Sequence, residues 1–334
     1  MLYLHRNESP YPPSPLVVEY VDKYIEYLNR YDVVELREEL ISELEKYTGL
    51  PREYIEFYPG SSHPLTLMIA LAKVKGIEVL MPHPTFHAIY PVLRGFKAPY
   101  RLVKLEENME LNSERFLRLV EGKLVYLANP NNPTSNLLVK DFDYIEKIAK
   151  KAKLVFIDEA YYEFSDFTVK DLVPELDNVV VVRSLSKAFS LAGARFGYVL
   201  ASGKAMDLLN SLRIGFETPV ITQAIALGAL RDKAYMKEVV SRIKSTRDHV
   251  RLKLLEHGLW SPVSSTNFLF IRLNKPCRGV WNALKGHGVL TMCLELIEDL
   301  AEYADYLRVT IGKPEDMELF LEKLLDMSLD RSVA

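Results

Sequence analysis

Residues 153–187 read KLVFIDEAYYEFSDFTVKDLVPELDNVVVVRSLSK, and this stretch indicates the fold. Its two short apolar runs, 154–157 and 179–182, end in polar residues, the first at Asp158 and the second at 184–187. Similar runs (IEFYPG, GIEVLMP, KLVYLANP and GYVLAS) alternate with longer helical patterns through the middle of the chain. This alternation predicts an α/β fold with a mainly parallel sheet flanked by helices. Ligands of such sheets bind at the carboxyl ends of the strands.

The helical patterns also suggest a division into domains. Apolar residues recur at helical spacing over 34–47 and 65–75, and Pro64 fits the first turn of the second of these helices. Beyond Asp232 the pattern changes to a long charged helix, the strand-like runs SSTNFLFIRL and YLRVTIG, and helices over 280–286 and 314–327. We expect a large domain over 33–232, with the N-terminal arm (1–32) and a smaller α+β domain (233–334) beside it.

Composition favours chemistry on small molecules. The 334 residues are 49% hydrophobic and carry a net charge of -3, which provides no strong field for nucleic acid or a membrane surface. No apolar run has the length of a membrane span or a signal peptide, so we expect a cytoplasmic protein. Cys277 and Cys293 form no CxxC motif, and His83 and His87 lack the HExxH pattern. We therefore expect neither a disulfide framework nor a metal site.

The segment 184–197, which contains Lys187, follows a continuous apolar run, so Lys187 should not lie on an ordinary wet surface. Burial disfavours the ammonium form and leaves a nucleophilic amine, which imine chemistry requires. Arg195, Ser184 and Ser186 could then bind a phosphate through charge-assisted hydrogen bonds. Taken alone, these residues would be explained better by a lysine at a strand end and an arginine in a salt bridge. No GxGxxG or Walker motif is present, which argues against a dinucleotide or nucleotide enzyme.

Three motifs together resemble the class I/II aminotransferases, which are fold-type-I enzymes dependent on pyridoxal 5'-phosphate (PLP). These motifs are NPNNPTSN at 129–136, DEAYYEF at 158–164 and SLSKAFSLAGARFG at 184–197. Within this family the chain is most similar to the histidinol-phosphate aminotransferases, from about Leu4 to the last helix. The resemblance implies a transaminase with a large PLP-binding domain and a smaller domain.

The resemblance also implies roles for individual residues. Lys187 would carry the cofactor as a Schiff base, and Asp158 would keep the pyridine nitrogen protonated so that the ring accepts electrons better. Asn132 and Tyr161 would contact the ring hydroxyl oxygen. The implied cofactor-binding residues comprise the phosphate ligands and an aromatic residue that stacks on the ring: Ser61, Ser62, Phe86, Ser184, Ser186 and Arg195.

At the substrate end, the resemblance implies that Arg308 binds an anionic group bidentately, with Asn267 and Asn7 nearby. Tyr31 would reach the cofactor phosphate of a partner subunit, which implies a homodimer with shared active sites. Thr291 stands where the family usually has a second arginine. The amino donor therefore stays open between histidinol phosphate and an amino acid, including aromatic ones.

The implied reaction is ping-pong transfer of an amino group through Lys187 to a 2-oxo acid such as 2-oxoglutarate. Two alternatives share the cofactor motifs. One is a PLP-dependent lyase related to the threonine-phosphate decarboxylases, and the other is a protein that binds PLP without catalysis.

Overall fold

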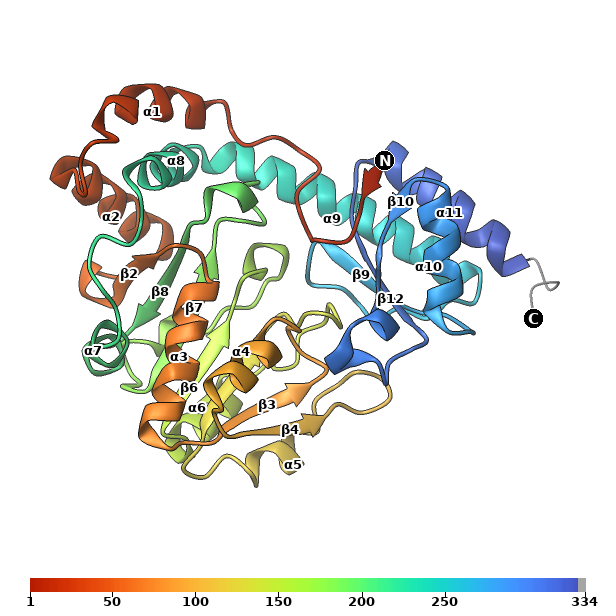
Figure 1. Cartoon of the computed structure of the whole chain (residues 1–334), viewed down its shortest axis with the longest axis horizontal. Coiled ribbons are helices and arrows are strands. Elements are labelled where there is room, and N and C mark those ends of the chain that lie inside the picture. Colours follow the sequence, from red (N-terminus) through yellow and green to blue (C-terminus); the bar gives the residue numbers. More distant parts are fainter. Residues whose placement is uncertain (330–334) are drawn as a thin grey trace.

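A seven-stranded sheet forms the centre of the larger part of the chain (Figure 1). The structure is a computed structural model and describes residues 1–329, so residues 330–334, the end of the expected small domain, lie outside the described residues. The strand order is β2-β8-β7-β6-β5-β3-β4. Strands β3 to β7 pair in parallel, and β8 is antiparallel to both of its neighbours. The prediction of a mainly parallel sheet is confirmed.

The strands of this sheet are β2 (Ile55–Tyr58), β3 (Val79–His83), β4 (Tyr100–Lys104), β5 (Leu124–Ala128), β6 (Leu154–Asp158), β7 (Val179–Ser184) and β8 (Gly197–Ala201). The helices around it are α1 (Leu16–Tyr24), α2 (Val34–Thr48), α3 (Ser62–Lys75), α4 (Ile89–Phe96), α5 (Ser113–Leu117), α6 (Phe142–Lys151), α7 (Gly203–Asn210) and α8 (Val220–Arg231). Short 3-10 helices are η1 (Ile25–Tyr27), η2 (Arg52–Tyr54), η3 (Tyr162–Phe164), η4 (Lys170–Leu172), η5 (Ala192–Ala194), η6 (Leu294–Leu296) and η7 (Glu298–Leu300).

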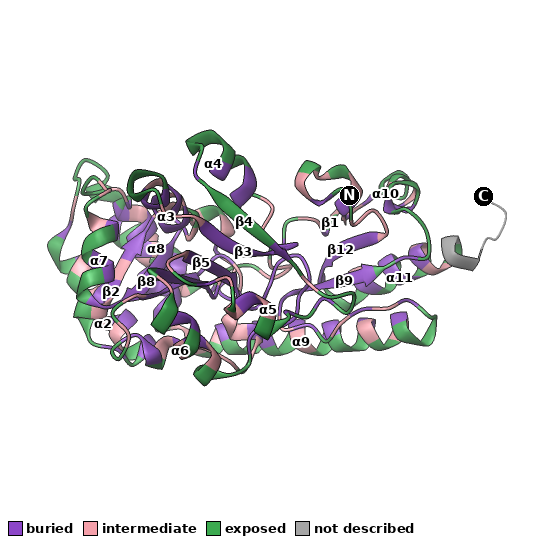
Figure 2. Ribbon diagram, turned by 90° about the horizontal axis from the view of Figure 1, so that it is seen from below, coloured by how far each residue is buried: buried purple, intermediate pink, exposed green. Residues whose placement is uncertain are grey.

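Strand β6 shows why the apolar runs are continuous. Its successive side chains point to opposite faces of the sheet. Val155 and Ile157 belong to the apolar core that contains helices α2, α6 and α8, whereas Leu154 and Phe156 belong to the core that contains α3, α4 and α7. Burial on both faces removes any need for polar residues within the strand. Figure 2 shows the inner strands buried, while β4 at the edge of the sheet carries exposed residues.

A smaller sheet lies to the right of the large one in Figure 1 and packs against the long helix α9 (Lys233–Glu256). Strands β9 (Phe268–Arg272), β11 (Met292–Cys293) and β12 (Tyr306–Thr310) pair antiparallel in the order β11-β12-β9. Helices α10 (Cys277–Gly286) and α11 (Pro314–Leu329) pack beside it. The expected helix over 280–286 and the strand YLRVTIG are confirmed.

The N-terminal arm contacts both parts of the molecule. Strand β1 (Leu2–Tyr3) pairs in parallel with β10 (Val289–Leu290), and α1 then packs against α8 of the large sheet. Gly228 permits this packing, because a Cβ there would lie 3.0 Å from the Leu16 carbonyl oxygen. Within residues 1–329, no helix combines the length and the hydropathy that a membrane crossing requires.

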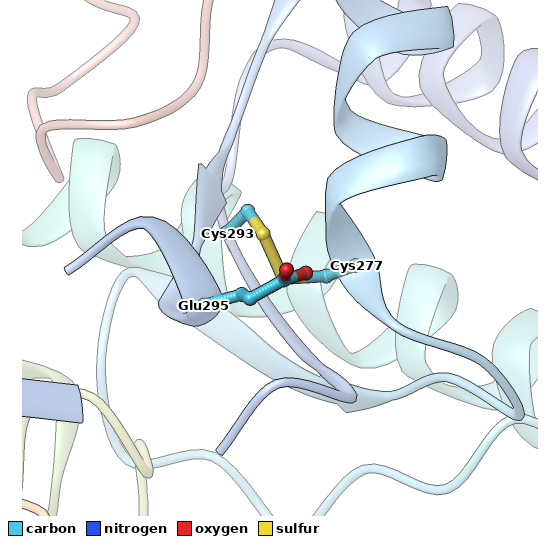
Figure 3. Close-up of side chains that lie close together, drawn as sticks. All are labelled: Cys277, Cys293 and Glu295. Carbon is cyan, nitrogen blue, oxygen red and sulfur yellow. A yellow bond between two sulfur atoms is a disulfide. The ribbon is translucent and has the colours of Figure 1, made fainter. Parts of the chain in front are cut away.

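The expectation that the cysteines would not pair is wrong. Cys277 and Cys293 form a disulfide, with Cα atoms 5.5 Å apart (Figure 3). The two residues are 16 positions apart in sequence, and only the packing of α10 against β11 brings them together, which spacing alone could not reveal. Glu295 lies beside the bridge, and its carboxylate accepts hydrogen bonds from the backbone N–H and the Nε of Arg278. Because both sulfur atoms are bonded to each other, they provide no thiolate pair for a metal.

We expect the double variant Cys277→Ser/Cys293→Ser to lose stability. Opening a loop of this size frees the unfolded chain and should lower the free energy of unfolding by roughly 3 kcal/mol. Urea unfolding of the two proteins under oxidising conditions measures the difference. A reductant should destabilise the wild type and leave the double variant unchanged, whereas equal stability of both proteins under oxidising conditions would contradict the expectation.

Candidate active site

A cavity of about 480 Å³ lies where strands β5, β6 and β7 end, between the large sheet, the small sheet and the N-terminal arm. Most of the residues singled out from the sequence line this cavity. They are Asn7, Ser61, Ser62, Phe86, Asn132, Asp158, Tyr161, Ser184, Ser186, Lys187, Arg195 and Arg308. The cavity thus lies at the carboxyl edge of the parallel sheet, where ligands of such folds bind.

Lys187 follows β7, and its side chain crosses the cavity toward the N-terminal arm. Its Nζ donates to the backbone oxygens of Asn7 at 3.0 Å and Arg6 at 3.3 Å. Burial, assisted by the Arg308 cation, lowers the pKa of Lys187 to about 8. A substantial share of this amine is therefore neutral near pH 8 and can act as a nucleophile.

Asp158 ends β6 at the floor of the cavity. Its Oδ2 accepts a hydrogen bond from the Tyr126 hydroxyl at 3.1 Å, and its Oδ1 accepts from the Ala160 N–H at 3.1 Å. Burial raises the pKa of Asp158 to about 6, although the hydrogen bonds from Ala160 and Tyr126 act in the opposite direction. A cationic ligand nitrogen at this carboxylate would favour its ionised form, which fits a protonated pyridine ring.

The opposite end of the cavity holds hydroxyl groups and one guanidinium. Helix α3 begins with Ser61 and Ser62, and Arg195 Nη2 donates to Ser62 Oγ at 3.3 Å. Ser184 and Ser186 also line the cavity. In the described part of the chain, no carboxylate lies within 4.0 Å of Arg195, so its charge is available to a ligand. A helix N-terminus, hydroxyls and a free guanidinium together suit a phosphate group.

Two glycines allow these elements to approach one another. A Cβ at Gly60 would lie 2.6 Å from Arg195 Nη2, and a Cβ at Gly197 would lie 2.4 Å from the Ser61 nitrogen. Gly60 also has φ +81°, which side chains rarely adopt. The backbone beside the serines therefore has no room for a larger residue.

We expect Gly197→Ala to weaken PLP binding at least about tenfold, because the methyl group must displace the backbone of Gly60 and Ser61. Gly193→Ala is the matched control, since nothing lies within 4 Å of a Cβ there. Equilibrium titration of the cofactor-free variants with PLP measures both dissociation constants. Equal dissociation constants for the two variants would contradict the proposed phosphate cradle.

Arg308 belongs to β12 of the small sheet and lines the cavity from that side. Its side chain is buried, since the residue is only 2% exposed. Its Nη1 donates to Asn132 Oδ1 and its Nη2 to the His5 carbonyl oxygen, both at 2.6 Å, while Nε has no partner. Among residues 1–329, no carboxylate lies within 4.0 Å to balance its charge. Burial lowers the pKa of Arg308 to about 10. An unbalanced buried cation is costly, and an anionic ligand would offset that cost.

Asn7, in the N-terminal arm, forms hydrogen bonds with cavity residues and with residues behind the cavity wall. Its Nδ2 donates to the Tyr161 hydroxyl at 2.9 Å, and its backbone N–H donates to Thr310 Oγ1 at 2.9 Å. Its carbonyl oxygen accepts from Lys187 and also from Asn267 Nδ2, at 3.1 Å. Asn267 is fully buried and does not line the cavity, so in this structure it supports Asn7 from behind.

Tyr31 lies outside the cavity of its own chain. It is 85% exposed between η1 and α2, and its ring lies 6.1 Å from that of Phe216. Leu28 and Val34, close to Tyr31 in sequence, and Ile214, close to Phe216, are exposed as well. A role for Tyr31 at the cofactor would require a second copy of the chain.

Several residues that line the cavity, or that contact its lining residues, were not identified from the sequence. Tyr126 sits inside an apolar strand, where it looks like ordinary core. His87, which follows Phe86, lines the cavity, and burial lowers its pKa to about 4. Arg6 and Glu8 flank Asn7 at the mouth of the cavity, and their place beside that asparagine was the only signal that could have indicated them.

The match to known proteins agrees with this geometry. The family described as aminotransferase class I and II matches residues 2–324. The chain belongs to this family. Histidinol-phosphate aminotransferase 2 of Archaeoglobus fulgidus is 33% identical over 332 residues, which cover 97% of this chain and 92% of that protein.

Solved structures extend the comparison. The histidinol-phosphate aminotransferase of Sinorhizobium meliloti, in complex with pyridoxal-5'-phosphate, superposes with a TM-score of 0.87 at 25% identity, covering 100% of this chain and 91% of that one. The L-threonine-O-3-phosphate decarboxylase of Porphyromonas gingivalis has a TM-score of 0.82 at 17% identity, covering 98% and 99%. This second likeness shows the fold alone, so the lyase alternative is not favoured.

The chain is thus a PLP-dependent aminotransferase of fold type I, with PLP as its cofactor. The cavity fits that group, because its lining combines a buried carboxylate, a lysine of lowered pKa, and several hydroxyls with a guanidinium. When bound, PLP supplies an aldehyde that takes up amino groups and a ring that withdraws electrons from the reacting carbon.

Proposed function

We propose that this aminotransferase takes its amino group from a small anionic amine, with histidinol phosphate as the first candidate, and passes it to a 2-oxo acid such as 2-oxoglutarate. The single observation that carries this proposal is the buried, unbalanced Arg308 on the cavity wall. The names of the relatives support histidinol phosphate as donor, and with it a place in histidine biosynthesis.

We assign the steps to side chains as follows. The Lys187 amine holds the cofactor, is released when the amino substrate binds, and then moves a proton at its Nζ between substrate and cofactor carbons. Asp158 holds the proton on the ring nitrogen, and Tyr126 keeps that carboxylate in place. Asn132 and Tyr161 orient the ring.

The phosphate of the cofactor would lie among the remaining polar groups, with Phe86 against the ring. The residues assigned to that phosphate are Ser61, Ser62, Ser184, Ser186 and Arg195. Arg308 would bind the anionic group of the substrate, while Asn7 and Asn267 hold the backbone that faces it.

Thr291 bears on the choice of donor. Its hydroxyl is buried and has no hydrogen-bond partner, and it contributes no charge. Arg308 is therefore the one buried cation available to a substrate within the described cavity. One guanidinium suits one anionic group, which is the phosphate of histidinol phosphate or the carboxylate of an amino acid.

We expect Arg308→Gln to lower kcat/KM for the preferred donor by about 10² to 10³, because removing one partner of a buried ion pair costs about 3–5 kcal/mol. The first half-reaction is followed by the absorbance of the bound cofactor, with histidinol phosphate, glutamate and phenylalanine as donors. Arg272→Gln is the control, since Arg272 lies on the neighbouring strand β9 and pairs with Asp305 at the surface. If the wild type converts none of the three donors, the proposed substrate class is wrong.

We also propose a homodimer in which Tyr31 reaches the phosphate site of the partner subunit. The exposed apolar side chains around Tyr31 support this, because such patches commonly mark protein interfaces. We further propose that 33–232 forms one domain and the remaining residues an arm and a smaller domain, and that the enzyme works in the cytoplasm.

A further inference from the structure

Two walls of the cavity come from distant parts of the chain. Phe86 and His87 follow β3 of the large sheet, whereas Met292 and Arg308 lie on β11 and β12 of the small sheet. A substrate bound at Arg308 must fit between these walls. A contact that joins them from outside the cavity therefore influences how well the substrate fits.

His83 and Glu302 form such a contact. His83 ends β3, three residues before Phe86, and is only 3% exposed. Its Nε2 lies 2.8 Å from Oε1 of Glu302, which lies between η7 and β12. The hydroxyl of the adjacent Tyr303 donates to the His83 carbonyl oxygen at 3.2 Å, and the two rings lie 5.4 Å apart.

For a neutral imidazole, the two hydrogen bonds of His83 determine which ring nitrogen donates and which accepts. The Glu302 carboxylate can only accept, so Nε2 carries the proton, and Nδ1 accepts from the Tyr90 hydroxyl at 2.8 Å. Tyr90 in turn accepts from the Thr85 N–H at 3.4 Å. Burial lowers the pKa of His83, so the imidazole is neutral and both ring nitrogens are used. The contact thus fixes the strand end that leads into the Phe86 wall.

Apart from the Tyr303 hydrogen bond, the other polar contacts of this region are ion pairs with at least one well-exposed partner. Lys104 also pairs with Glu302, and Arg94 pairs with Glu298 and Asp299. The side chains of Lys104 and Glu298 are 64% and 85% exposed, and pairs of this kind contribute little. Because His83 is buried, loss of its bond to Glu302 would leave a buried donor without a partner.

Apolar packing keeps this part of the small sheet close to the large one. Leu294, Leu300 and Tyr306 belong to the same core as Tyr90 and Leu93 of helix α4. Removal of the Glu302 carboxylate should therefore leave the protein folded, while the walls lose their fixed separation.

We propose that His83 and Glu302 are positioning residues, which hold the Phe86–His87 wall and the Met292–Arg308 wall at the separation that the amino substrate requires. The inference rests on the proposed function, because it concerns the cavity that would bind the amino donor. Neither residue lines the cavity, so each acts through the walls rather than on the reacting atoms.

The expected signature is a change in KM without a change in kcat. In Glu302→Ala the arrangement in which the two walls have the required separation becomes a minor state. The substrate must then use binding energy to restore this separation, so KM for histidinol phosphate should rise about tenfold. Once the substrate is bound the site is complete, so kcat and the PLP dissociation constant should stay within about twofold of wild type.

Three variants separate this role from a general loss of stability. Glu302→Gln keeps an oxygen that accepts from His83 and should restore KM to within about threefold of wild type. Glu298→Ala removes an acid from the same segment without touching His83, and should leave KM unchanged. In a His83→Asn background, Glu302→Ala should add no further effect, because the two residues act as a pair.

The experiment begins with wild type and histidinol phosphate, so that two failures can be told apart. Absence of transamination by the wild type would overturn the proposed function. An active wild type with an unchanged KM in Glu302→Ala would overturn the positioning role alone. Hydrogen exchange over 297–303 in the cofactor-free protein gives an independent test, because exchange should quicken in Glu302→Ala and stay unchanged in Glu298→Ala. Equal exchange in wild type and Glu302→Ala would also overturn the role.

Discussion

Lys187→Ala should lower kcat of the first half-reaction by about 10⁴, near the upper limit for loss of a general acid–base group. Alanine can neither hold the cofactor covalently nor carry the proton between the two carbons. Lys187 is the lysine that lines the described cavity, so no other lysine there can replace it. Stopped-flow absorbance of the PLP-loaded protein mixed with the amino donor measures the rate.

Two control variants make the Lys187 result specific. Lys187→Arg keeps the positive charge but not the nucleophilic amine, and should be as slow as the alanine variant. Lys204→Ala removes a surface lysine that pairs with Asp177, and should react at the wild-type rate. A rate within about tenfold of wild type for Lys187→Ala would contradict the role given to this amine.

Asp158→Asn is expected to have the next largest effect, a loss of about 10² to 10³ in kcat, comparable to removing one group that stabilises developing charge. The amide cannot hold a proton on the ring nitrogen, so the ring withdraws electrons less well. Tyr126→Phe removes only a hydrogen bond to this carboxylate and should have a much smaller effect.

The pH dependence of cofactor binding provides a second measurement on Asp158. Because burial raises its pKa to about 6, the group is a carboxylate above that pH and is protonated below it. PLP binding to the cofactor-free wild type should therefore weaken as the pH falls through about 6, and this step should be absent in Asp158→Asn. The same pH dependence in both proteins would mean that another group is titrating.

The central part of the fold could be predicted because local and long-range signals agree there. Strands buried on both faces must be continuously apolar, so the polar residues that follow them, such as Asp158 and Lys187, stand out at their ends. Since parallel strands end at one edge of the sheet, their place in sequence was enough to bring these residues together. Arg308 was singled out through the resemblance to the family rather than through the pattern of β12, in which every residue is buried.

Other features depend on contacts that a sequence does not display. The Tyr126 hydroxyl reaches Asp158 because β5 and β6 pair in one particular register. The disulfide depends on the position of helix α10 beside β11, and His83 meets Glu302 from 219 residues away. Asn267 was expected at the substrate, but the fold places Asn7 between Asn267 and the cavity. Tyr31 was expected at a cofactor phosphate, but within a single chain it lies at the surface.

Locating the covalently held cofactor tests the account most directly. The PLP-loaded protein is reduced with borohydride, which fixes the cofactor to its lysine, and the labelled peptide is identified by mass spectrometry. We predict a label on Lys187, and its loss when excess amino donor is added before reduction. A label on another lysine, or one on Lys187 that no amino donor removes, would contradict the proposed catalytic role of Lys187.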